Sequence, residues 1–175
     1  GWASANELTR IDFAHDSHVS TFLADNQIEG KVETGPVEHT ILAGLDYKYY
    51  NIDQEQASAP FGSTPTINPF DPVYGRPLTP RETYLNQDMT LQSLGLYAQD
   101  QLRFGNGWLV TLNGRYDWST LETTDGPTAF TDATRARSRD DGSFSGRAGI
   151  AYEFANGVTP YASVATFFNP AIGTL

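Results

Sequence analysis

The chain has 175 residues, no cysteine and a formal net charge of −10 at pH 7. The lack of cysteine excludes disulfides, thiolate-bound zinc and a cysteine nucleophile, and the negative charge argues against a nucleic-acid partner, because phosphate binding needs a basic surface. The mean hydropathy is −0.41, and no apolar run approaches the ~18 residues that a membrane helix needs. The chain starts at Gly1 without a signal peptide or an initiator Met, so we expect a fragment or a processed form.

The predicted elements are all strands, because apolar and polar residues alternate with a period of two and capped helical spacing is nearly absent. In chain order the alternation covers residues 22–33, 41–50, 93–104, 108–118, 144–154 and, less regularly, 158–168, with a possible further strand at 7–14. Asp100 interrupts the apolar face of its segment.

Aromatic residues, 13% of the chain, mark both ends of the apolar face in two of these segments. Trp108 and Trp118 are ten residues apart, as are Phe144 and Phe154. Ten residues at about 3.3 Å each cover roughly 33 Å and rise roughly 25 Å at a tilt of about 40°, the height of the apolar band of an outer-membrane barrel. A soluble β-sandwich also alternates but has no reason to repeat this spacing. We therefore predict a membrane girdle made of Phe104, Trp108, Tyr116, Trp118, Phe144, Tyr152 and Phe154.

The connections between the predicted strands alternate in length. In chain order they are an outer loop near 15–18, a short turn at 35–38, a long loop at 51–88, a short turn at 105–107, a long loop at 121–142 and a short turn at 155–157. Gly107 and Gly157 occupy the third loop position, where a three-residue hairpin needs a left-handed residue. Short periplasmic turns and long extracellular loops are typical of outer-membrane barrels.

The sequence thus predicts an all-β fold, an antiparallel up-and-down meander of about six or seven strands. A bacterial barrel needs at least eight strands to close. We therefore expect residues 1–175 to form part of a larger transmembrane barrel.

Two features of the long loops are candidates for binding. Phe61, Phe70 and Tyr74 lie in a stretch rich in proline and aromatic residues, and they either contact a ligand or pack within the loop. Arg135, Arg137 and Arg139 recur at every second position, so an extended backbone places them on one face. They either bind lipopolysaccharide phosphates or an anionic ligand, or pair with nearby acids, and we favour the pairing.

Other polar residues give no sign of catalysis or of a metal site. His15, His18 and His39 match no common metal motif, and no set of nucleophile, base and orienting group is evident. The ionisable residues on the polar faces fit a salt-bridged wall around a wet lumen; they are Asp46, Lys48, Arg115, Asp117, Arg147 and Glu153. We expect neither a bound metal nor an enzymatic activity.

Several sequence segments carry a family resemblance. They are Asp25-Asn26-Gln27, the stretches 39–47 and 95–101, Val110 to Trp118 with its Gly-Arg-Tyr-Asp word, and Gly157 to Ser163 with its Gly-Val-Thr-Pro-Tyr word. In order and spacing they resemble TonB-dependent siderophore receptors, particularly the ferrichrome and hydroxamate group.

The resemblance implies a 22-stranded barrel with a plug, located in the outer membrane of a Gram-negative cell. It implies a ferric siderophore as transported ligand with no covalently bound cofactor, and a TonB complex that acts on the plug, which this chain lacks. Outer-membrane lipid and lipopolysaccharide would surround the barrel. Phe61, followed by Gly62, is the nearest match to a ligand-contacting loop aromatic of the family, and Phe70 and Tyr74 match less closely.

Three alternatives stay open at this point. A passive porin or an adhesin-type barrel shares the strand pattern, and a TonB-dependent receptor for another cargo shares the family words. An outer-membrane enzyme is the third alternative, although the residues give no support for it.

Overall fold

The computed structural model describes residues 1–168, and all regular structure in them is β-strand. The strands are β1 (Trp2–Ser4), β2 (Glu7–Leu8), β3 (Phe13–Thr34), β4 (Val37–Ser58), β5 (Glu82–Phe104), β6 (Trp108–Asp125), β7 (Arg135–Tyr152) and β8 (Tyr161–Ala165). Within residues 1–168 there is no helix with the length and apolar character needed to cross a membrane.

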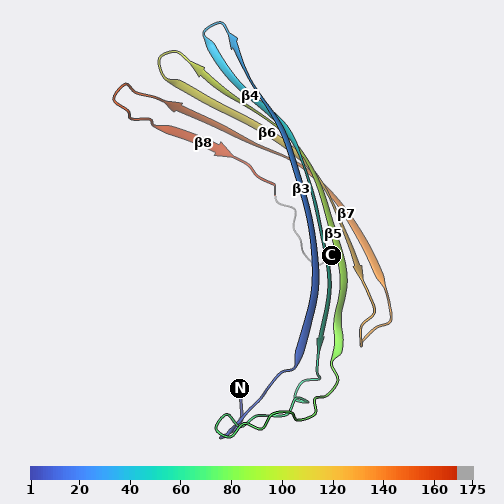
Figure 1. The fold of residues 1–175 in the computed structure, drawn as a ribbon. Helices are drawn as coiled ribbons and strands as arrows, with labels where there is room; N and C mark the ends of the chain where they lie inside the picture. Colours follow the sequence, from blue (N-terminus) through green and yellow to red (C-terminus); the bar gives the residue numbers. More distant parts are fainter. Residues whose placement is uncertain (169–175) are drawn as a thin grey trace. The chain divides into compact units, whose positions relative to one another are not determined.

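Six strands form one sheet in the order β3-β4-β5-β6-β7-β8, so each strand pairs with its neighbour in sequence (Figure 1). This confirms the predicted antiparallel meander. The prediction of one further strand at 7–14 is wrong. Glu7–Leu8 forms β2 and pairs with β1 in a separate two-stranded sheet, whereas Phe13 and Ala14 begin β3.

The strands run further than the predicted segments, so the predicted loop bounds need correction. Residues 15–18 lie inside β3 and form no outer loop, the loop predicted at 51–88 is confined to 59–81, and the loop predicted at 121–142 is confined to 126–134. The reason is that alternation ends where both faces of a strand become polar, while backbone ladder bonds continue with the neighbouring strands. Polar turn-forming residues were therefore mistaken for loops.

The chain divides into two compact units. The loop unit comprises Gly1–Ser20, Asn51–Thr90 and Glu122–Arg137, and the hairpin unit comprises Thr21–Tyr50, Leu91–Leu121 and Ser138–Leu175. Both long loops belong to the loop unit, and the short turns belong to the hairpin unit. The connections 59–81 and 126–134 are longer than those at 35–36 and 105–107, whereas the predicted outer loop near 15–18 lies within β3.

Glycines close the short turns as the sequence predicts. Gly107 and Gly157 have φ values of 129° and 85°, which side chains with a Cβ rarely adopt. Past the end of β7, Phe154 N–H donates to Val158 O at 3.0 Å and Tyr152 N–H donates to Pro160 O at 3.2 Å. The hairpin register therefore continues into a three-residue turn at 155–157.

The sheet of the hairpin unit has two different faces. One face carries the small buried set, with Leu91 and Leu121 at 2% and 3% exposure and with Asp117, Ser119 and Ser145 also buried. We call it the inner face. The other, outward face leaves its apolar side chains exposed; they include Phe22, Ile28, Leu45, Leu96, Leu112, Trp118, Phe144, Ile150 and Val164.

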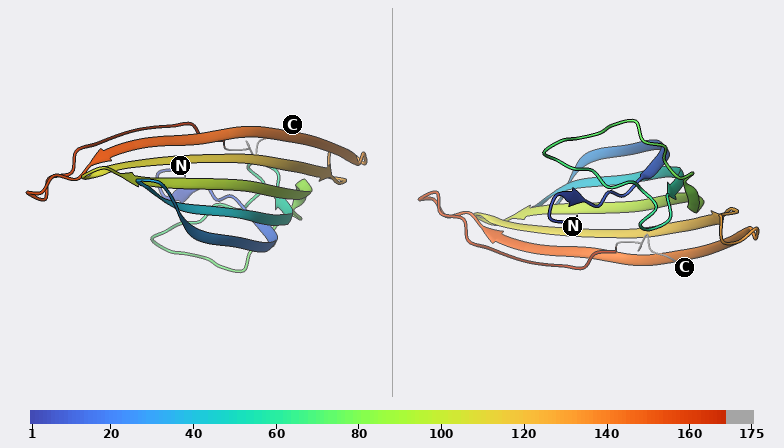
Figure 2. Two further views of the ribbon diagram at one scale, coloured as in Figure 1. Left: turned by 90° about the horizontal axis from the view of Figure 1, so that it is seen from above. Right: turned by 90° about the horizontal axis from the view of Figure 1, so that it is seen from below.

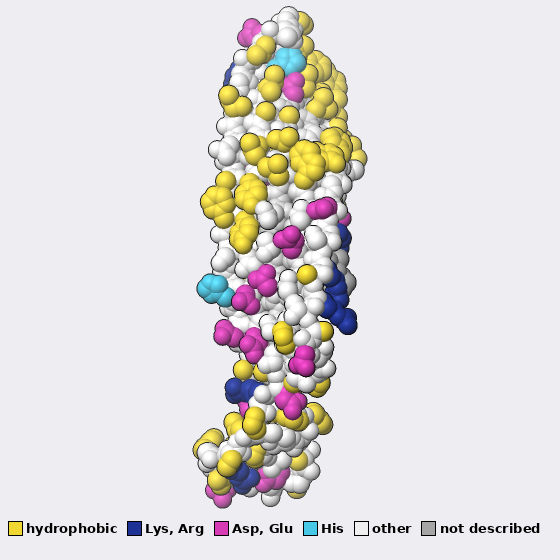
Figure 3. All heavy atoms as spheres, turned by 90° about the vertical axis from the view of Figure 1, so that its right-hand side faces the viewer, with side chains coloured by type: hydrophobic (Ala, Val, Ile, Leu, Met, Phe, Trp, Pro, Cys, Tyr) yellow, Lys and Arg dark blue, Asp and Glu magenta, His cyan; other side chains and the backbone are white. Residues whose placement is uncertain are grey.

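No large side chain is fully buried anywhere in residues 1–168. Figure 3 shows hydrophobic side chains gathered over much of one face in the upper part of the view. A soluble sheet would bury such a face, since exposed apolar surface on this scale is rare in water-soluble monomers. The outward face therefore requires an apolar medium.

Candidate functional site

The loop at 59–81 presents aromatic side chains to solvent. Phe61 is 100% exposed, and Phe70 and Tyr74 are each 76% exposed. No ring contact joins these three residues to one another among the described side chains. The structure therefore places all three predicted ligand residues on one loop, but as separate projections rather than as a cluster.

Two of these aromatics, Phe61 and Phe70, lie in tight local turns. Phe61 and Gly62 are the central residues of a turn in which Ser63 N–H donates to Pro60 O at 3.0 Å. Gly62 and Gly75 have positive φ angles of 80° and 77°. Glycine adopts these at no steric cost, and Gly62 closes the turn that holds Phe61, whereas Gly75 follows Tyr74 in a stretch without a hydrogen-bonded turn. Phe70 N–H donates to the Asn68 side chain at 2.9 Å. These hydrogen bonds order the backbone that carries Phe61 and Phe70.

In the loop unit, polar side chains of neighbouring strands hydrogen-bond to one another. These strand residues lie within the ranges 51–88 and 121–142 that the sequence predicts to be loops. Gln54 donates to Gln87 at 3.1 Å, and Gln87 donates to Asp125 at 2.8 Å. Asp125 also lies 3.6 Å from Arg137. The polar stretches of β4, β5 and β6 thus bind one another through their side chains, a feature that alternation cannot reveal.

The three arginines predicted on loop 121–142 lie on β7. Arg137 pairs with Asp125, and Arg139 pairs with Asp141 at 2.7 Å. The favoured interpretation, pairing with nearby acids, is confirmed for these two residues.

The inner face of the hairpin unit carries a charged network centred on Arg115. Its guanidinium forms ion pairs with Asp46 of β4 and with Asp117 of its own strand, the latter at 2.5 Å. Arg103 pairs with Glu153 at 2.8 Å. The prediction of a salt-bridged wall is confirmed for the residues in these pairs.

Two long side chains of this network each cross a neighbouring strand. Tyr97 of β5 donates to Asp25 of β3 at 2.7 Å and passes over Gly44 of β4, where a Cβ would collide with its ring. Arg115 of β6 reaches Asp46 of β4 across β5, where a Cβ on Gly95 would collide with the guanidinium.

Gly44 and Gly95 lie on the polar face of the predicted alternation. The sequence analysis does not predict that a long side chain from another strand lies across each of them. Gly44 with Asp46, Gly95 with Tyr97, and Arg115 with Asp117 lie within the segments that carry the family resemblance. The segments that resemble the family therefore contain the residues that form this cross-strand network.

The residue that interrupts the apolar face also has a partner. Asp100 lies 2.7 Å from His39 Nδ1, and His39 Nε2 lies 2.8 Å from the Thr34 hydroxyl. The predicted segment 41–50 does not include His39, and its pairing with Asp100 is not predicted by the alternation.

Five of the seven predicted girdle residues form two groups of rings in the hairpin unit, whereas Phe104 and Phe144 take no part in these ring contacts. Trp108 meets Tyr152 with centroids 4.9 Å apart, and Tyr152 meets Phe154 at 4.7 Å. Tyr116 and Trp118 meet at 4.5 Å. These contacts place aromatic rings near both limits of the predicted apolar band on β6.

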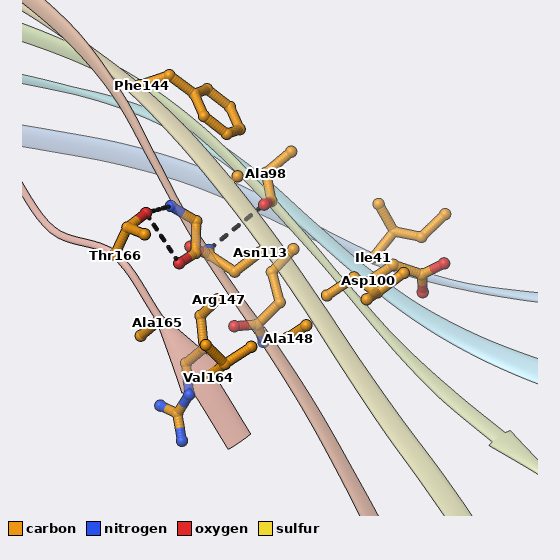
Figure 4. A pocket seen from close by; sticks show the side chains of 14 residues that line it. Ile41, Ala98, Asp100, Asn113, Phe144, Arg147, Ala148, Val164, Ala165 and Thr166 are labelled. Carbon is orange, nitrogen blue, oxygen red and sulfur yellow. Dashed lines mark hydrogen bonds between the residues drawn. The ribbon is translucent and has the colours of Figure 1, made fainter. Parts of the chain in front are cut away.

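A shallow hollow of about 620 Å³ lies on the outward face, over Gly114 and Gly146. Figure 4 shows Phe144 and Arg147 of β7, both of which line it, pointing in opposite directions. Its walls are largely apolar, with Ile41, Leu112 and Val164 among them. The hollow lacks the converging polar groups that orient a polar ligand, and we assign it to the apolar surface.

Metal binding can be examined only in residues 1–168. That part of the chain has no group of three or more His, Cys, Asp or Glu residues arranged to hold a metal ion.

The fold and its surface define the wall of a membrane β-barrel: a meander of long strands, an exposed apolar outward face and an ion-paired inner face. Comparison with known proteins agrees. The family model described as TonB dependent receptor-like, beta-barrel matches residues 2–175. The chain therefore belongs to this family, and its location is the outer membrane of a Gram-negative bacterium.

Relatives of known name make the comparison more specific. The chain is 33% identical over 171 residues to the ferrioxamine B receptor of Salmonella typhimurium (strain LT2), covering 97% of this chain and 23% of that protein. It is 34% identical over 172 residues to the ferrichrome outer membrane transporter/phage receptor of Escherichia coli (strain K12), covering 94% and 22%. The chain thus spans less than a quarter of the length of these relatives.

A solved structure supports the fold. The siderophore receptor PiuA from Acinetobacter baumannii superposes with a TM-score of 0.70 at 18% identity, covering 86% of this chain and 24% of that one.

Proposed function

We propose that this chain is a sector of the barrel wall of a receptor that binds a ferric siderophore at the cell surface and imports it with energy from TonB. The observation that carries the proposal is the similarity, over 97% of the chain, to a receptor named for ferrioxamine B. The exposed loop aromatics and the charged inner wall supply the surfaces that such a receptor needs.

The complete barrel has 22 strands in this proposal, the size of outer-membrane transporters with a plugged lumen. Residues 1–175 contribute six of them, β3 to β8. The outward face meets lipid, with the girdle aromatics at the two interfaces and lipopolysaccharide around the outer end.

The ligand in this proposal is a hydroxamate-type ferric complex, because relatives are named for ferrioxamine and ferrichrome. Phe61, Phe70 and Tyr74 contact it from loop 59–81. The ferric ion is cargo and remains chelated by the siderophore, so the barrel wall supplies apolar and polar contacts rather than iron ligands. The chain performs no enzymatic reaction.

TonB acts through a plug that is outside this chain. The ion-paired inner wall gives that plug a polar surface to slide against. No nucleic acid takes part, since a chain with net charge −10 offers no basic footprint.

The test uses the full-length receptor in detergent. It is titrated with ferrioxamine B, ferrichrome, ferric enterobactin and ferric citrate while tryptophan and tyrosine fluorescence is followed. We expect saturable, sub-micromolar quenching by one or both hydroxamates and none by the other two complexes. Uptake of the bound complex labelled with radioactive iron should then require TonB in intact cells. A receptor that binds none of the four, or that conducts ions passively, contradicts the proposal and supports another cargo or a porin.

A further inference from the structure

The loop that carries Phe61 is anchored along an extended segment that precedes β3, residues 8–12, which we call the anchor segment. Leu8 and Ile67 exchange two backbone hydrogen bonds, at 2.8 and 3.1 Å. Arg10 Nε donates to Pro65 O at 2.9 Å, and Ala59 N–H donates to Asp12 O at 2.8 Å. Leu8 and Asp12 bond through their backbone and Arg10 through its side chain, so three alternate positions of the anchor segment hold the loop. The N-terminal segment and the loop lie beside each other in Figures 1 and 2.

Asp12 holds both ends of the loop. Its backbone oxygen accepts from Ala59, the first residue after β4, and its Oδ1 accepts from Arg81, the last residue before β5. Arg81 donates through Nε at 2.9 Å and through Nη2 at 2.8 Å. The Asp12 side chain is only 13% exposed. The Arg81 side chain is 44% exposed, so this partly exposed ion pair, together with the bond to Ala59, ties the first and last residues of the loop to Asp12.

The Phe61 turn lies between two of these anchors. Ala59 precedes it and Pro65 follows it, and Thr79 donates its hydroxyl to Ser63 O at 3.4 Å from the far side of the loop. The turn therefore has a fixed direction although Phe61 itself contacts nothing. A ring that is fully exposed on an anchored backbone is suited to meeting a ligand.

We propose that Arg10, Asp12 and Arg81 are positioning residues that hold loop 59–81 in the conformation in which Phe61 meets the ferric siderophore. This inference depends on the proposed function. A loop that is ordered before binding does not pay the entropy of ordering when the ligand arrives, so loosening it weakens binding without removing any ligand contact.

The test uses the full-length receptor with Asp12→Asn, Arg81→Gln and the charge exchange Asp12→Arg/Arg81→Asp. Asp16→Asn is the matched control, because it removes the same charge from β3 at an exposed residue with no ion pair among residues 1–168. Two quantities are measured: the Kd for ferrioxamine B, and amide hydrogen exchange in residues 59–67 without ligand. From the energy of partly exposed ion pairs we expect each single variant to raise the Kd about 5-fold and to speed exchange about 5-fold. The charge exchange should return both close to wild type, and the control should change neither.

Two results would overturn the inference. A raised Kd with unchanged exchange means that these residues touch the ligand or act elsewhere. Faster exchange with an unchanged Kd means that the loop conformation does not matter for binding. If the wild-type receptor binds no hydroxamate, the proposed function fails, while the exchange data still decide whether Asp12 and Arg81 hold the loop.

Discussion

Two glycines on the inner face matter because long side chains lie across them. Any side chain at Gly95 would push the Arg115 guanidinium away from Asp46. We expect Gly95→Ala to lower the free energy of unfolding of the full-length receptor by about 2 kcal/mol, a typical cost of overpacking. Urea unfolding in lipid vesicles measures this.

Gly30→Ala is the matched control for that experiment, since a Cβ at Gly30 meets nothing within 4 Å. It should be neutral or stabilising by about 0.5 kcal/mol. Equal effects at the two glycines would show that no side chain lies across Gly95.

Arg115 separates two carboxylates that would otherwise face each other unscreened. Arg115→Gln leaves Asp46 and Asp117 without their cation, and we expect a loss of about 2 kcal/mol, less than for a fully buried pair because these side chains are partly exposed. Adding Asp46→Asn should recover part of the loss. Additive losses in the double variant, again measured by urea unfolding, would contradict the network.

In the proposed ligand site, Phe61 is the residue whose loss we expect to weaken binding most. Phe61→Ala should raise the Kd for ferrioxamine B about 10-fold, as for an exposed aromatic that becomes covered on binding. Phe130→Ala is the control, because Phe130 is also an exposed phenylalanine (75%) but lies on loop 126–134. Equal Kd values for the two variants in a fluorescence titration would remove Phe61 from the site.

At the scale of elements, the two faces of β6 give a matched test of lipid contact. Leu112 and Asn113 are adjacent, near the middle of the segment between Trp108 and Trp118, and alternation places them on opposite faces. Leu112→Arg should destabilise the receptor in vesicles by about 2–4 kcal/mol, the cost of an arginine near the bilayer midplane. Asn113→Arg should cost far less, because its side chain meets the lumen. Comparable costs at both positions would show that the faces are misassigned.

The strands are predictable from the sequence only where one face meets lipid, because only there do apolar and polar residues alternate. The segment 108–118 was recognised because its even residues are apolar, whereas the continuation of β6 to Asp125 was not, because Glu122 to Asp125 are polar on both faces. There the strand exists through pairing with neighbours, a long-range property that local alternation does not contain. The same limit explains why the sequence predicts a loop near 15–18, where the structure has β3.

The candidate site was predictable as a set of residues but not as an arrangement. Proline and glycine, which form turns, mark the stretch that contains Phe61, Phe70 and Tyr74 as a loop. The docking of residues 8–12 against the loop joins Asp12 to Arg81, which are far apart in sequence. No spacing rule predicts such a contact, and only the folded chain reveals it.

For the whole molecule, the sheet has no core of its own in residues 1–168. Its outward face is apolar and exposed, and β3 and β8 are edges of the six-stranded sheet. Unpaired edges and apolar patches drive association in water. The isolated 175-residue chain should therefore oligomerise or aggregate when diluted from denaturant, which light scattering after size-exclusion chromatography detects. A stable dilute monomer would contradict the barrel assignment.

The central claim is that the sheet separates lipid from a wet lumen, and nitroxide scanning of residues 108–118 in the full-length receptor tests it most directly. One cysteine at a time is introduced and spin-labelled, which the lack of native cysteine in this chain makes simple, and accessibility to oxygen and to a water-soluble nickel complex is measured in vesicles. We predict that labels at even positions meet oxygen and labels at odd positions meet nickel, with a period of two across the segment. Accessibility without that period, or with nickel reaching both faces equally, would contradict a lipid-embedded barrel wall.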